Sequence, residues 1–181
     1  MSFDRERFID DCLAALSEAD ARAAVEEVVR RAVSDPGRVI AELGEPRQVI
    51  TETLYESPGL SIFNAHWGPR LDFYPHDHGM WAVIGVYGGR EDNTFYRRSG
   101  DGLVRHGVKE VGMRETLALG ESVIHSVANP LDRITAGIHV YGGELRATRR
   151  SEWDPVTFEE RPFDEERSLR VFEEANARLQ S

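Results

Sequence analysis

The chain has 181 residues, which suits one domain able to bury most of its apolar surface. Its 32 acidic side chains outnumber its 22 basic ones, the formal net charge is −10, and no run of Lys and Arg forms a basic face. The composition therefore predicts no nucleic-acid partner and no membrane partner. The charged opening MSFDRERFIDD lacks the apolar stretch of a secretory signal, so we expect a cytoplasmic protein.

Residues 1–45 have a helical pattern. Apolar side chains recur at helical spacing from Phe8 to Leu16 and again from Ala24 to Ala32. The sequence Asp35-Pro36-Gly37 is a strong helix breaker, after which residues 39–43 predict one further helical turn. We therefore expect the chain to open with helices.

The single cysteine, Cys12, belongs to the first of these helices. One thiol can form neither an intramolecular disulfide nor a multi-cysteine metal cluster, so any metal must be held by histidine or carboxylate. The ordinary interpretation of Cys12 is a small buried hydrophobic side chain.

Residues 46–145 consist of short runs rich in Val, Ile, Thr, Phe and Tyr, separated by Gly, Pro, Asn and Asp. This pattern predicts an antiparallel jelly-roll barrel. The expected strands are Val49–Glu56, Ser61–Trp67, Trp81–Tyr87, Asn93–Arg98, Arg114–Ala118, Ser122–Val127 and Ile134–Tyr141. The expected turns are Ser57-Pro58-Gly59, Gly88-Gly89 and Gly100-Asp101-Gly102.

Residues 146–181 are again rich in charge, and their apolar spacing predicts one amphipathic helix beginning near Asp164. The sequence has no internal repeat and no long flexible linker. We therefore expect a single, mainly β domain over residues 1–181, with N-terminal helices and one C-terminal helix around the barrel.

The motif Pro75-His76-Asp77-His78-Gly79 is the strongest chemical signal. In an extended segment residues i and i+2 point to the same side, so both imidazoles can reach one ion while Asp77 points away. An isolated HxH is weak, because a histidine at a strand end is commonly just hydrogen-bonded. Its place before a strand and a Gly-Gly turn, at the mouth of a small barrel, strengthens the metal interpretation.

A second motif, His125-Ser126-Val127-Ala128-Asn129, follows Gly120 in another expected strand. HxH followed by G…HxxxN resembles the two cupin motifs. The longer strings PHDHGMWAVIGVYGGRED and GIHVYGG resemble the thiol dioxygenases, the family of cysteine dioxygenase and 3-mercaptopropionate dioxygenase, over roughly residues 50–143.

The resemblance implies a cupin double-stranded β-helix with a three-histidine site at His76, His78 and His125. The implied metal is one iron(II) per chain, although Zn or Ni would suit the same ligands. Generic cupins add a Glu shortly after the second His, but residues 79–84 contain no carboxylate, which favours the thiol dioxygenase branch. The implied reaction adds both atoms of O2 to the sulfur of a small thiol and gives a sulfinic acid. The sequence leaves the oligomeric state open.

His139 and Tyr141 match a His and a Tyr that lie beside the metal in this family and form a relay. The resemblance therefore implies that Tyr141 hydrogen-bonds bound substrate and that His139 orients its hydroxyl. Some members carry a Ser two residues before this His, where this chain has Gly137, so the relay is shortened. The family's cross-linking Cys has Val83 in its place, so no such cross-link is expected.

The substrate anchor of cysteine dioxygenases, an Arg on a strand upstream of the metal motif, has no counterpart in Ile50–Leu54. Free cysteine is therefore a doubtful substrate. Arg70, Arg97, Arg98 and Arg133 are each able to clamp a carboxylate, although a solvated surface charge is the more ordinary interpretation. An Arg or Gln aimed at the metal would support a carboxylated thiol, and a wholly apolar wall would count against one.

Five further residues are weaker candidates. His66 or Trp67 could line the pocket, and core packing is the simpler role for Trp67. Trp81 could wall the pocket and exclude water. We interpret Glu91 as an exposed turn carboxylate, and we place His106 in a Gly-rich exposed loop without a role.

Other classes of function remain open at this stage. The same three histidines would suit a metal-dependent oxygenase, isomerase or hydrolase that acts on a non-thiol substrate. A non-catalytic cupin that binds a small ligand is a third class. The metal and the consumption of O2 distinguish these alternatives.

Overall fold

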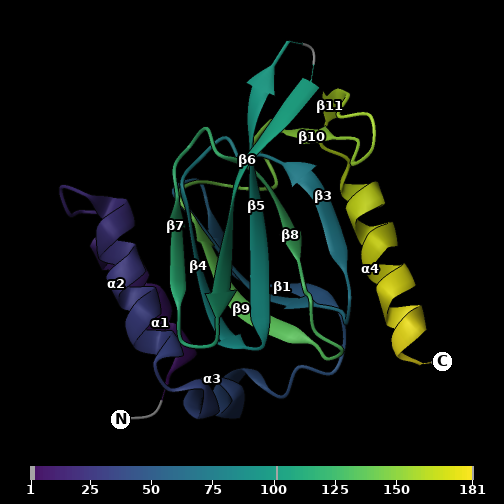
Figure 1. Cartoon of the computed structure of the whole chain (residues 1–181). Helices are drawn as coiled ribbons and strands as arrows, with labels where there is room; N and C mark the ends of the chain where they lie inside the picture. The colour runs from purple at the N-terminus through teal and green to yellow at the C-terminus, as the bar shows by residue number, and fades with distance from the viewer. Residues whose placement is uncertain (1–2, 101, 181) are drawn as a thin grey trace.

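The computed structural model describes residues 3–100 and 102–180; Asp101, in one of the expected turns, lies outside the described residues. Helices flank a β-rich centre (Figure 1). The helices are α1 (Arg5–Ala15), α2 (Ala21–Val33), α3 (Pro36–Leu43) and α4 (Glu165–Leu179). The strands are β1 (Ile50–Ser57), β2 (Leu60–Trp67), β3 (Asp72–His76), β4 (Ala82–Gly88), β5 (Arg90–Ser99), β6 (Gly102–Gly112), β7 (Thr116–Leu119), β8 (Ile124–Ala128), β9 (Thr135–Tyr141), β10 (Ser151–Trp153) and β11 (Glu160–Pro162).

The strands form two antiparallel sheets. One has the order β1-β2-β9-β4-β7 and the other the order β11-β10-β3-β8-β5-β6. Strands that follow one another in sequence, such as β3 and β4 or β8 and β9, belong to opposite sheets, as in a jelly roll. The expected fold, a double-stranded β-helix with helices at both ends of the chain, is confirmed.

Aspartates cap three of the helices, and one of them, Asp164, marks the helix start that the sequence predicts. Asp4 accepts a hydrogen bond from the Arg7 amide, Asp20 accepts one from the Ala23 amide, and Asp164 accepts two from the first turn of α4. The third helix is longer than the single turn expected, because Pro36 begins it and supplies the backbone angle of a first helical turn.

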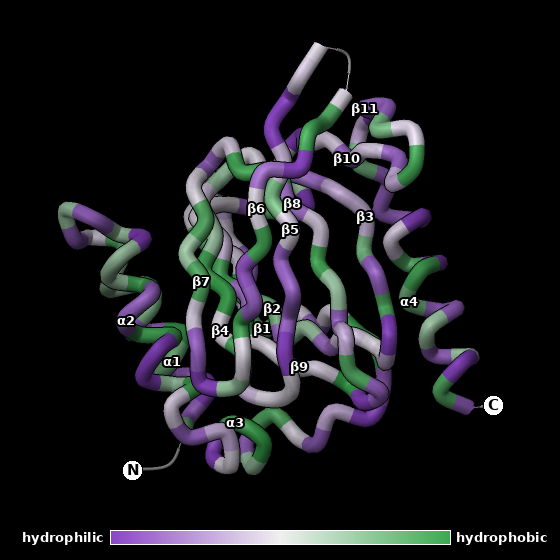
Figure 2. Tube along the Cα trace, viewed as in Figure 1, coloured by the Kyte–Doolittle hydropathy of each residue, from purple (hydrophilic) through white to green (hydrophobic). Residues whose placement is uncertain are grey.

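The outer face of the β9 sheet packs against α1, α2 and α3. Alternate residues of β9, namely Ala136, Ile138 and Val140, are fully buried in this apolar layer. Gly85 of β4 lies directly beneath α2, so close to Val29 that a side chain there would collide. Apolar segments of the helices and strands face one another across this layer (Figure 2).

At the opposite side of the barrel, α4 packs beside β3 (Figure 1). Phe172 of α4 contacts Trp67 and Phe73, and the buried carboxylate of Glu152 accepts hydrogen bonds from Arg167 and from the Asp164 amide. Apolar contacts and the hydrogen bonds of Glu152 therefore connect α4 to β2, β3 and β10.

Four strands, β3, β6, β10 and β11, were not among those expected. The prediction that His106 lies in a loop is wrong, because it lies in β6, although its side chain is exposed as expected. The glycines of this segment suggested a loop, but β6 pairs with β5 along its whole length and forms the edge of its sheet. The hairpin of β5 and β6 projects beyond the barrel (Figure 1).

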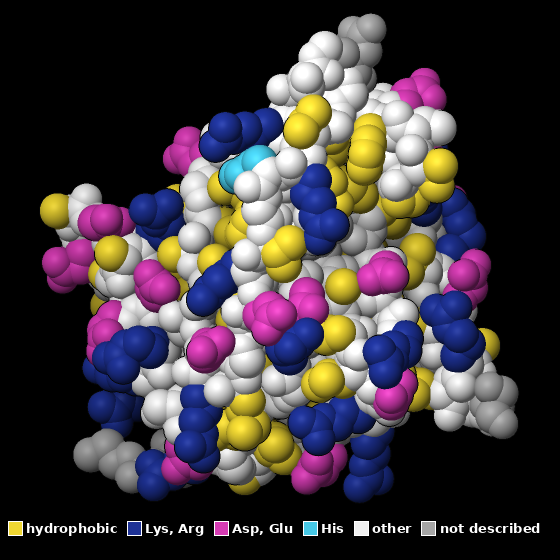
Figure 3. All heavy atoms as spheres, in the orientation of Figure 1, with side chains coloured by type: hydrophobic (Ala, Val, Ile, Leu, Met, Phe, Trp, Pro, Cys, Tyr) yellow, Lys and Arg dark blue, Asp and Glu magenta, His cyan; other side chains and the backbone are white. Residues whose placement is uncertain are grey.

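Basic and acidic side chains are intermixed over the face of the molecule that carries β5 and β6 (Figure 3). Arg90, for example, forms ion pairs with Asp92 and Glu110. No helix among the described residues is long and apolar enough to cross a membrane.

Candidate metal centre

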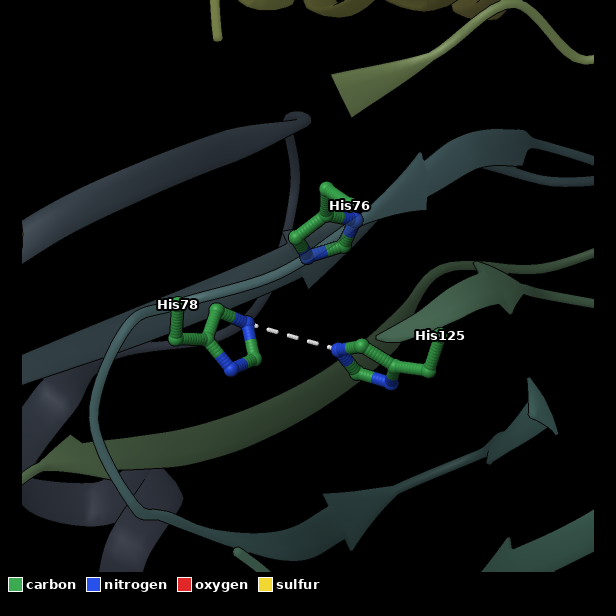
Figure 4. Close-up of side chains that lie close together, drawn as sticks. All are labelled: His76, His78 and His125. Atoms are coloured by element: carbon green, nitrogen blue, oxygen red, sulfur yellow. Dashed lines mark hydrogen bonds between the residues drawn. The ribbon is translucent and has the colours of Figure 1, made fainter. Parts of the chain in front are cut away.

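Three histidines, from β3, from the segment that follows β3 and from β8, converge inside the barrel (Figure 4). His76 ends β3, His78 follows two residues later, and His125 of β8 is the direct partner of His76 across the antiparallel pair. The Nε2 atoms of His78 and His125 are 3.3 Å apart, and one nitrogen from each ring lies within 4.8 Å of the other two. The side chains predicted to be metal ligands are therefore brought together.

Hydrogen bonds orient two of the three rings. The Nδ1–H of His76 donates to the Tyr74 carbonyl at 3.0 Å, and the Nδ1–H of His125 donates to Oδ1 of Asn93 at 2.8 Å. Because Nδ1 carries the hydrogen in both neutral rings, Nε2 keeps its lone pair. This is the outer-shell arrangement typical of metal-binding histidines.

Burial keeps these rings neutral. The three residues are only 6%, 3% and 1% exposed in chain order. Burial lowers the pKa of His76 to about 4 and lowers the pKa of His78 and His125 well below the usual value, with the neighbouring histidines adding to the effect. Neutral imidazole is the form that binds a metal ion.

The chemistry of this donor set fits a divalent metal. Two nitrogens bound to one ion at about 2.0–2.1 Å are separated by roughly 3.0–3.4 Å, which matches the distance between His78 and His125. Nδ1 of His78 is buried and has no hydrogen-bond partner among the described residues. We therefore conclude that the three-histidine cluster offers a metal ion a pre-formed, uncharged set of ligands.

No carboxylate belongs to this cluster in the described part of the chain. Asp77 is directed away from the cluster, as predicted, because its Oδ1 accepts a hydrogen bond from the Ser151 amide. Asn129 of the HxxxN motif is not a ligand either. Its amide clamps a loop by donating to the carbonyls of Trp67, Gly68 and Arg133.

His139 and Tyr141 occupy the inner face of β9, next to the histidines. The rings of Tyr141 and His78 are 5.0 Å apart, and Nδ1 of His139 is 3.3 Å from the Tyr141 hydroxyl oxygen. Burial raises the pKa of Tyr141, so this hydroxyl stays protonated at neutral pH. The structure therefore brings these two side chains together beside the histidine cluster.

Glu91 contradicts our expectation of an exposed turn carboxylate, because it is 0% exposed. Its Oε1 accepts hydrogen bonds from Trp67 Nε1 at 2.7 Å and from His139 Nε2 at 2.9 Å. The expectation failed because β5 starts immediately after the Gly-Gly turn, so Glu91 is already part of the strand and its side chain points to the inner face. The pattern Glu91, Asn93, Phe95 would have shown that Glu91 shares the inward face with Asn93.

A cavity of about 290 Å³ opens beside the cluster, at the small end of the range for ligand sites. His76, His78, His139 and Tyr141 contribute to its lining. Its apolar walls come from β1, β2, β3, the segment after β9, the segment between β11 and α4, and α4 itself, and they include Phe63, Trp67, Phe73, Leu145, Phe163 and Phe172.

Two proposed pocket residues lie elsewhere. Trp81 packs against Gly142 and the helical layer outside the barrel, so the expectation that it walls the pocket is wrong. His66 is bonded to the Gln48 carbonyl and the Tyr87 hydroxyl and does not line the cavity, whereas Trp67 does. The residue in the place of the family's cysteine, Val83, faces the helical layer.

Cys12 is the buried hydrophobic side chain that the sequence predicted. It is 0% exposed within the layer of α1 and α2, and burial raises the pKa of its thiol to about 12. A thiol held protonated in this way is a poor nucleophile and a poor metal ligand.

The four arginines suggested as carboxylate clamps are all exposed, and none lines the cavity: Arg70, Arg97, Arg98 and Arg133. Sequence reasoning missed Arg150, which does line the cavity and whose side chain is only 8% exposed. Its guanidinium lies 3.4 Å from the ring centre of Phe163 and donates to Glu165 at 2.6 Å. Burial lowers the pKa of Arg150, and Glu165 opposes this effect.

No family model matches the chain. Among solved structures, a protein with a double-stranded β-helix domain from Klebsiella pneumoniae is 12% identical, with a TM-score of 0.41 over 66% of this chain and 88% of that one. An RmlC-like cupin from Methanocaldococcus jannaschii is 11% identical, with a TM-score of 0.45 over 55% and 84%. Oxalate oxidase is 15% identical, with a TM-score of 0.43 over 55% and 53%. At these values the likeness concerns the backbone fold and says nothing of a reaction.

Proposed function

We propose that this chain is a non-heme iron(II)-dependent dioxygenase that oxidises the sulfur of a small thiol to a sulfinic acid. The overall change, RSH + O2 to RSO2H, is balanced without a further reductant. The observation that carries the proposal is a buried cluster of three neutral histidines, with no carboxylate among them, that opens on a small cavity beside Tyr141. The thiol dioxygenase resemblance of the histidine motifs agrees with this arrangement.

The charge of the ligand set supports the choice of a thiol. When bound, iron(II) would supply its redox chemistry and its full positive charge, which favours the thiolate form of a thiol. The cluster consists of three neutral histidines and includes no carboxylate from the described residues. No negatively charged protein ligand therefore competes with the thiolate for the charge of the metal.

The residues around the cavity suit a small substrate. Aromatic walls exclude water from the reacting groups, and the Tyr141 hydroxyl is available to hydrogen-bond a bound molecule. His139 orients that hydroxyl from behind. A volume of about 290 Å³ excludes a large thiol and favours one with few heavy atoms.

Arg150 supports an anionic group on the substrate. It brings a buried positive charge to a wall of the same cavity, and a guanidinium can bind a carboxylate through two parallel hydrogen bonds. We therefore propose a carboxylated thiol such as 3-mercaptopropionate. In such a complex Glu165 would lose part of its bond to Arg150.

The experiment is anaerobic loading with iron(II), followed by oxygen-electrode measurements with cysteine, cysteamine and 3-mercaptopropionate. We expect uptake of one O2 per thiol consumed and a sulfinate product identified by mass spectrometry, fastest with the carboxylated thiols. If no thiol stimulates uptake although iron is bound, the proposal is wrong, and a non-thiol substrate or another metal takes its place. Bound thiol without turnover would instead indicate a ligand-binding cupin.

A further inference from the structure

Glu91 is a buried carboxylate that touches the relay from the side away from the cavity. Its Oε1 is 2.9 Å from Nε2 of His139, a residue 48 positions later in the chain, and 2.7 Å from Nε1 of Trp67. His139 and Trp67 line the cavity, but Glu91 does not. Glu91 therefore acts on a bound substrate only through its neighbours.

The contacts of Glu91 decide which nitrogen of His139 carries a hydrogen. The Trp67 indole can only donate, and an ionised carboxylate can only accept. The contact between Glu91 and Nε2 of His139 is therefore a hydrogen bond only when Nε2 carries the hydrogen. In the neutral ring Nδ1 then has a free lone pair, which faces the Tyr141 hydroxyl at 3.3 Å.

Gly137 explains how the carboxylate fits beside His139. A Cβ atom at position 137 would lie 3.2 Å from the Gly85 carbonyl oxygen, 3.3 Å from Oε1 of Glu91 and 3.4 Å from Nε2 of His139. A larger side chain at this position would therefore compete with Glu91 for the same nitrogen. The absence of a side chain at Gly137 therefore leaves the space in which the Glu91 carboxylate reaches Nε2 of His139.

We propose that Glu91 is the positioning residue of this site. It fixes the Nε2–H tautomer of His139, so that Nδ1 accepts the Tyr141 hydroxyl hydrogen and the Tyr141 oxygen is presented to the cavity as an acceptor. The relay is therefore complete, with a carboxylate at its end in place of a hydroxyl at position 137. The role of Glu91 in turnover rests on the proposed thiol oxidation, but its effect on the His139 tautomer does not depend on that function.

The tautomer can be measured by 15N NMR on metal-free protein labelled at histidine, with His139 assigned by a His139→Gln variant. We expect the Nε2–H form in the wild-type chain and its loss in Glu91→Ala. In the double variant Glu91→Ala/Gly137→Ser, the new hydroxyl can accept from Nε2 and should restore this form. An unchanged His139 tautomer in Glu91→Ala would overturn the proposal.

Glu91→Gln keeps the test decisive if removal of the side chain prevents folding. The amide oxygen can still accept from both donors, so the tautomer should persist while the charge-assisted hydrogen bond weakens. The His139 Nε2–H proton resonance should then move upfield, and no movement would contradict the proposal. Glu152→Gln is the matched control, because it neutralises another fully buried carboxylate and should leave the His139 signals unchanged.

Turnover separates this inference from the proposed function. With iron(II) and a thiol that supports O2 uptake, Glu91→Ala should lower kcat by roughly 10- to 100-fold, the usual cost of losing an outer-shell partner. KM should change little, because Glu91 does not line the cavity, and the double variant should recover part of the loss. If the His139 tautomer changes in Glu91→Ala but the wild-type chain oxidises no thiol, the proposed function is wrong and the positioning role of Glu91 stands. If the wild-type chain oxidises a thiol but the His139 tautomer is unchanged in Glu91→Ala, the proposed function stands and the positioning role of Glu91 is wrong.

Discussion

The two faces of strand β9 contrast sharply within one run of seven buried residues. The outward residues Ala136, Ile138 and Val140 pack in an apolar layer under the N-terminal helices. The inward residues include His139 and Tyr141, which belong to a polar chain beside the three-histidine cluster. A single backbone therefore supports both the core of the protein and its candidate site.

The two faces obey different rules. On the helical side, stability is preserved by any apolar side chain of similar volume, because apolar packing does not depend on one particular partner atom. On the cavity side each buried polar atom needs a particular partner, since an unsatisfied buried donor or acceptor costs about 1–3 kcal/mol. Substitutions on the helical face should therefore change stability, and those on the cavity face should change metal binding and chemistry.

The largest effect is expected from His125→Ala. Removal of one of three ligands should abolish stoichiometric iron binding and all O2 uptake, while the far-ultraviolet circular dichroism keeps the signature of the folded barrel. Metal content after reconstitution is the measurement. His66→Ala is the control, because His66 is also buried but is bonded to Gln48 and Tyr87, and it should retain the metal. Full metal occupancy in His125→Ala would exclude this residue as a ligand.

Ile138→Ala should show the opposite behaviour on the outward face of the same strand. Ile138 is 0% exposed, so truncation leaves a cavity under the helices and should lower the free energy of unfolding by about 2–5 kcal/mol. Urea denaturation measures this loss. Metal stoichiometry per folded chain should be unchanged, and a selective loss of metal would show that the two faces are not independent.

Acid should destabilise the metal-free protein in part through His76, a buried histidine of the cavity face. The pKa of His76 is about 4 in the folded chain, below the value near 6.5 of an unfolded one, so the unfolded state takes up the proton first as the pH falls. From about pH 7.5 to about pH 5 this residue should remove about 2 kcal/mol of stability. Urea midpoints measured across this range should fall more steeply for the wild-type chain than for His76→Gln. If the urea midpoints of the two proteins fall equally with pH, the lowered pKa of His76 is contradicted.

The smallest effect is expected from Arg150→Gln, which tests the anionic substituent. If Arg150 binds the substrate carboxylate, KM for 3-mercaptopropionate should rise about 10- to 100-fold, equivalent to the 1.5–3 kcal/mol of a hydrogen bond to a charged group. Cysteamine, which has no carboxylate, should be little affected. Arg149→Gln removes an exposed neighbour that does not line the cavity and is the matched control. Equal changes for both thiols would argue against a carboxylate contact.

Local sequence patterns predicted much of the framework because the forces behind them are local. Helical spacing and the capping side chain of Asp164 located α4, and alternation with flanking turns located seven of the strands. The pattern failed for β6, whose glycines resemble those of a loop. That strand exists because β5 pairs with it from Gly102 to Gly112, with one register shift opposite His106, and no single window of sequence contains both strands of this pair.

The candidate site divides in the same way. The sequence by itself predicted that His76 and His78 share one face and that His139 and Tyr141 share another, because side chains two apart on extended backbone share a face whatever surrounds them. The third histidine, His125, was implied only by the resemblance to the cupin motifs. Only the tertiary structure decided that Glu91 is buried against His139, that Asn93 orients His125 and that Arg150 reaches the cavity. Those contacts join different strands and segments, so their partners are chosen by sheet pairing and by the packing of α4, which the spacing of residues in the chain does not encode.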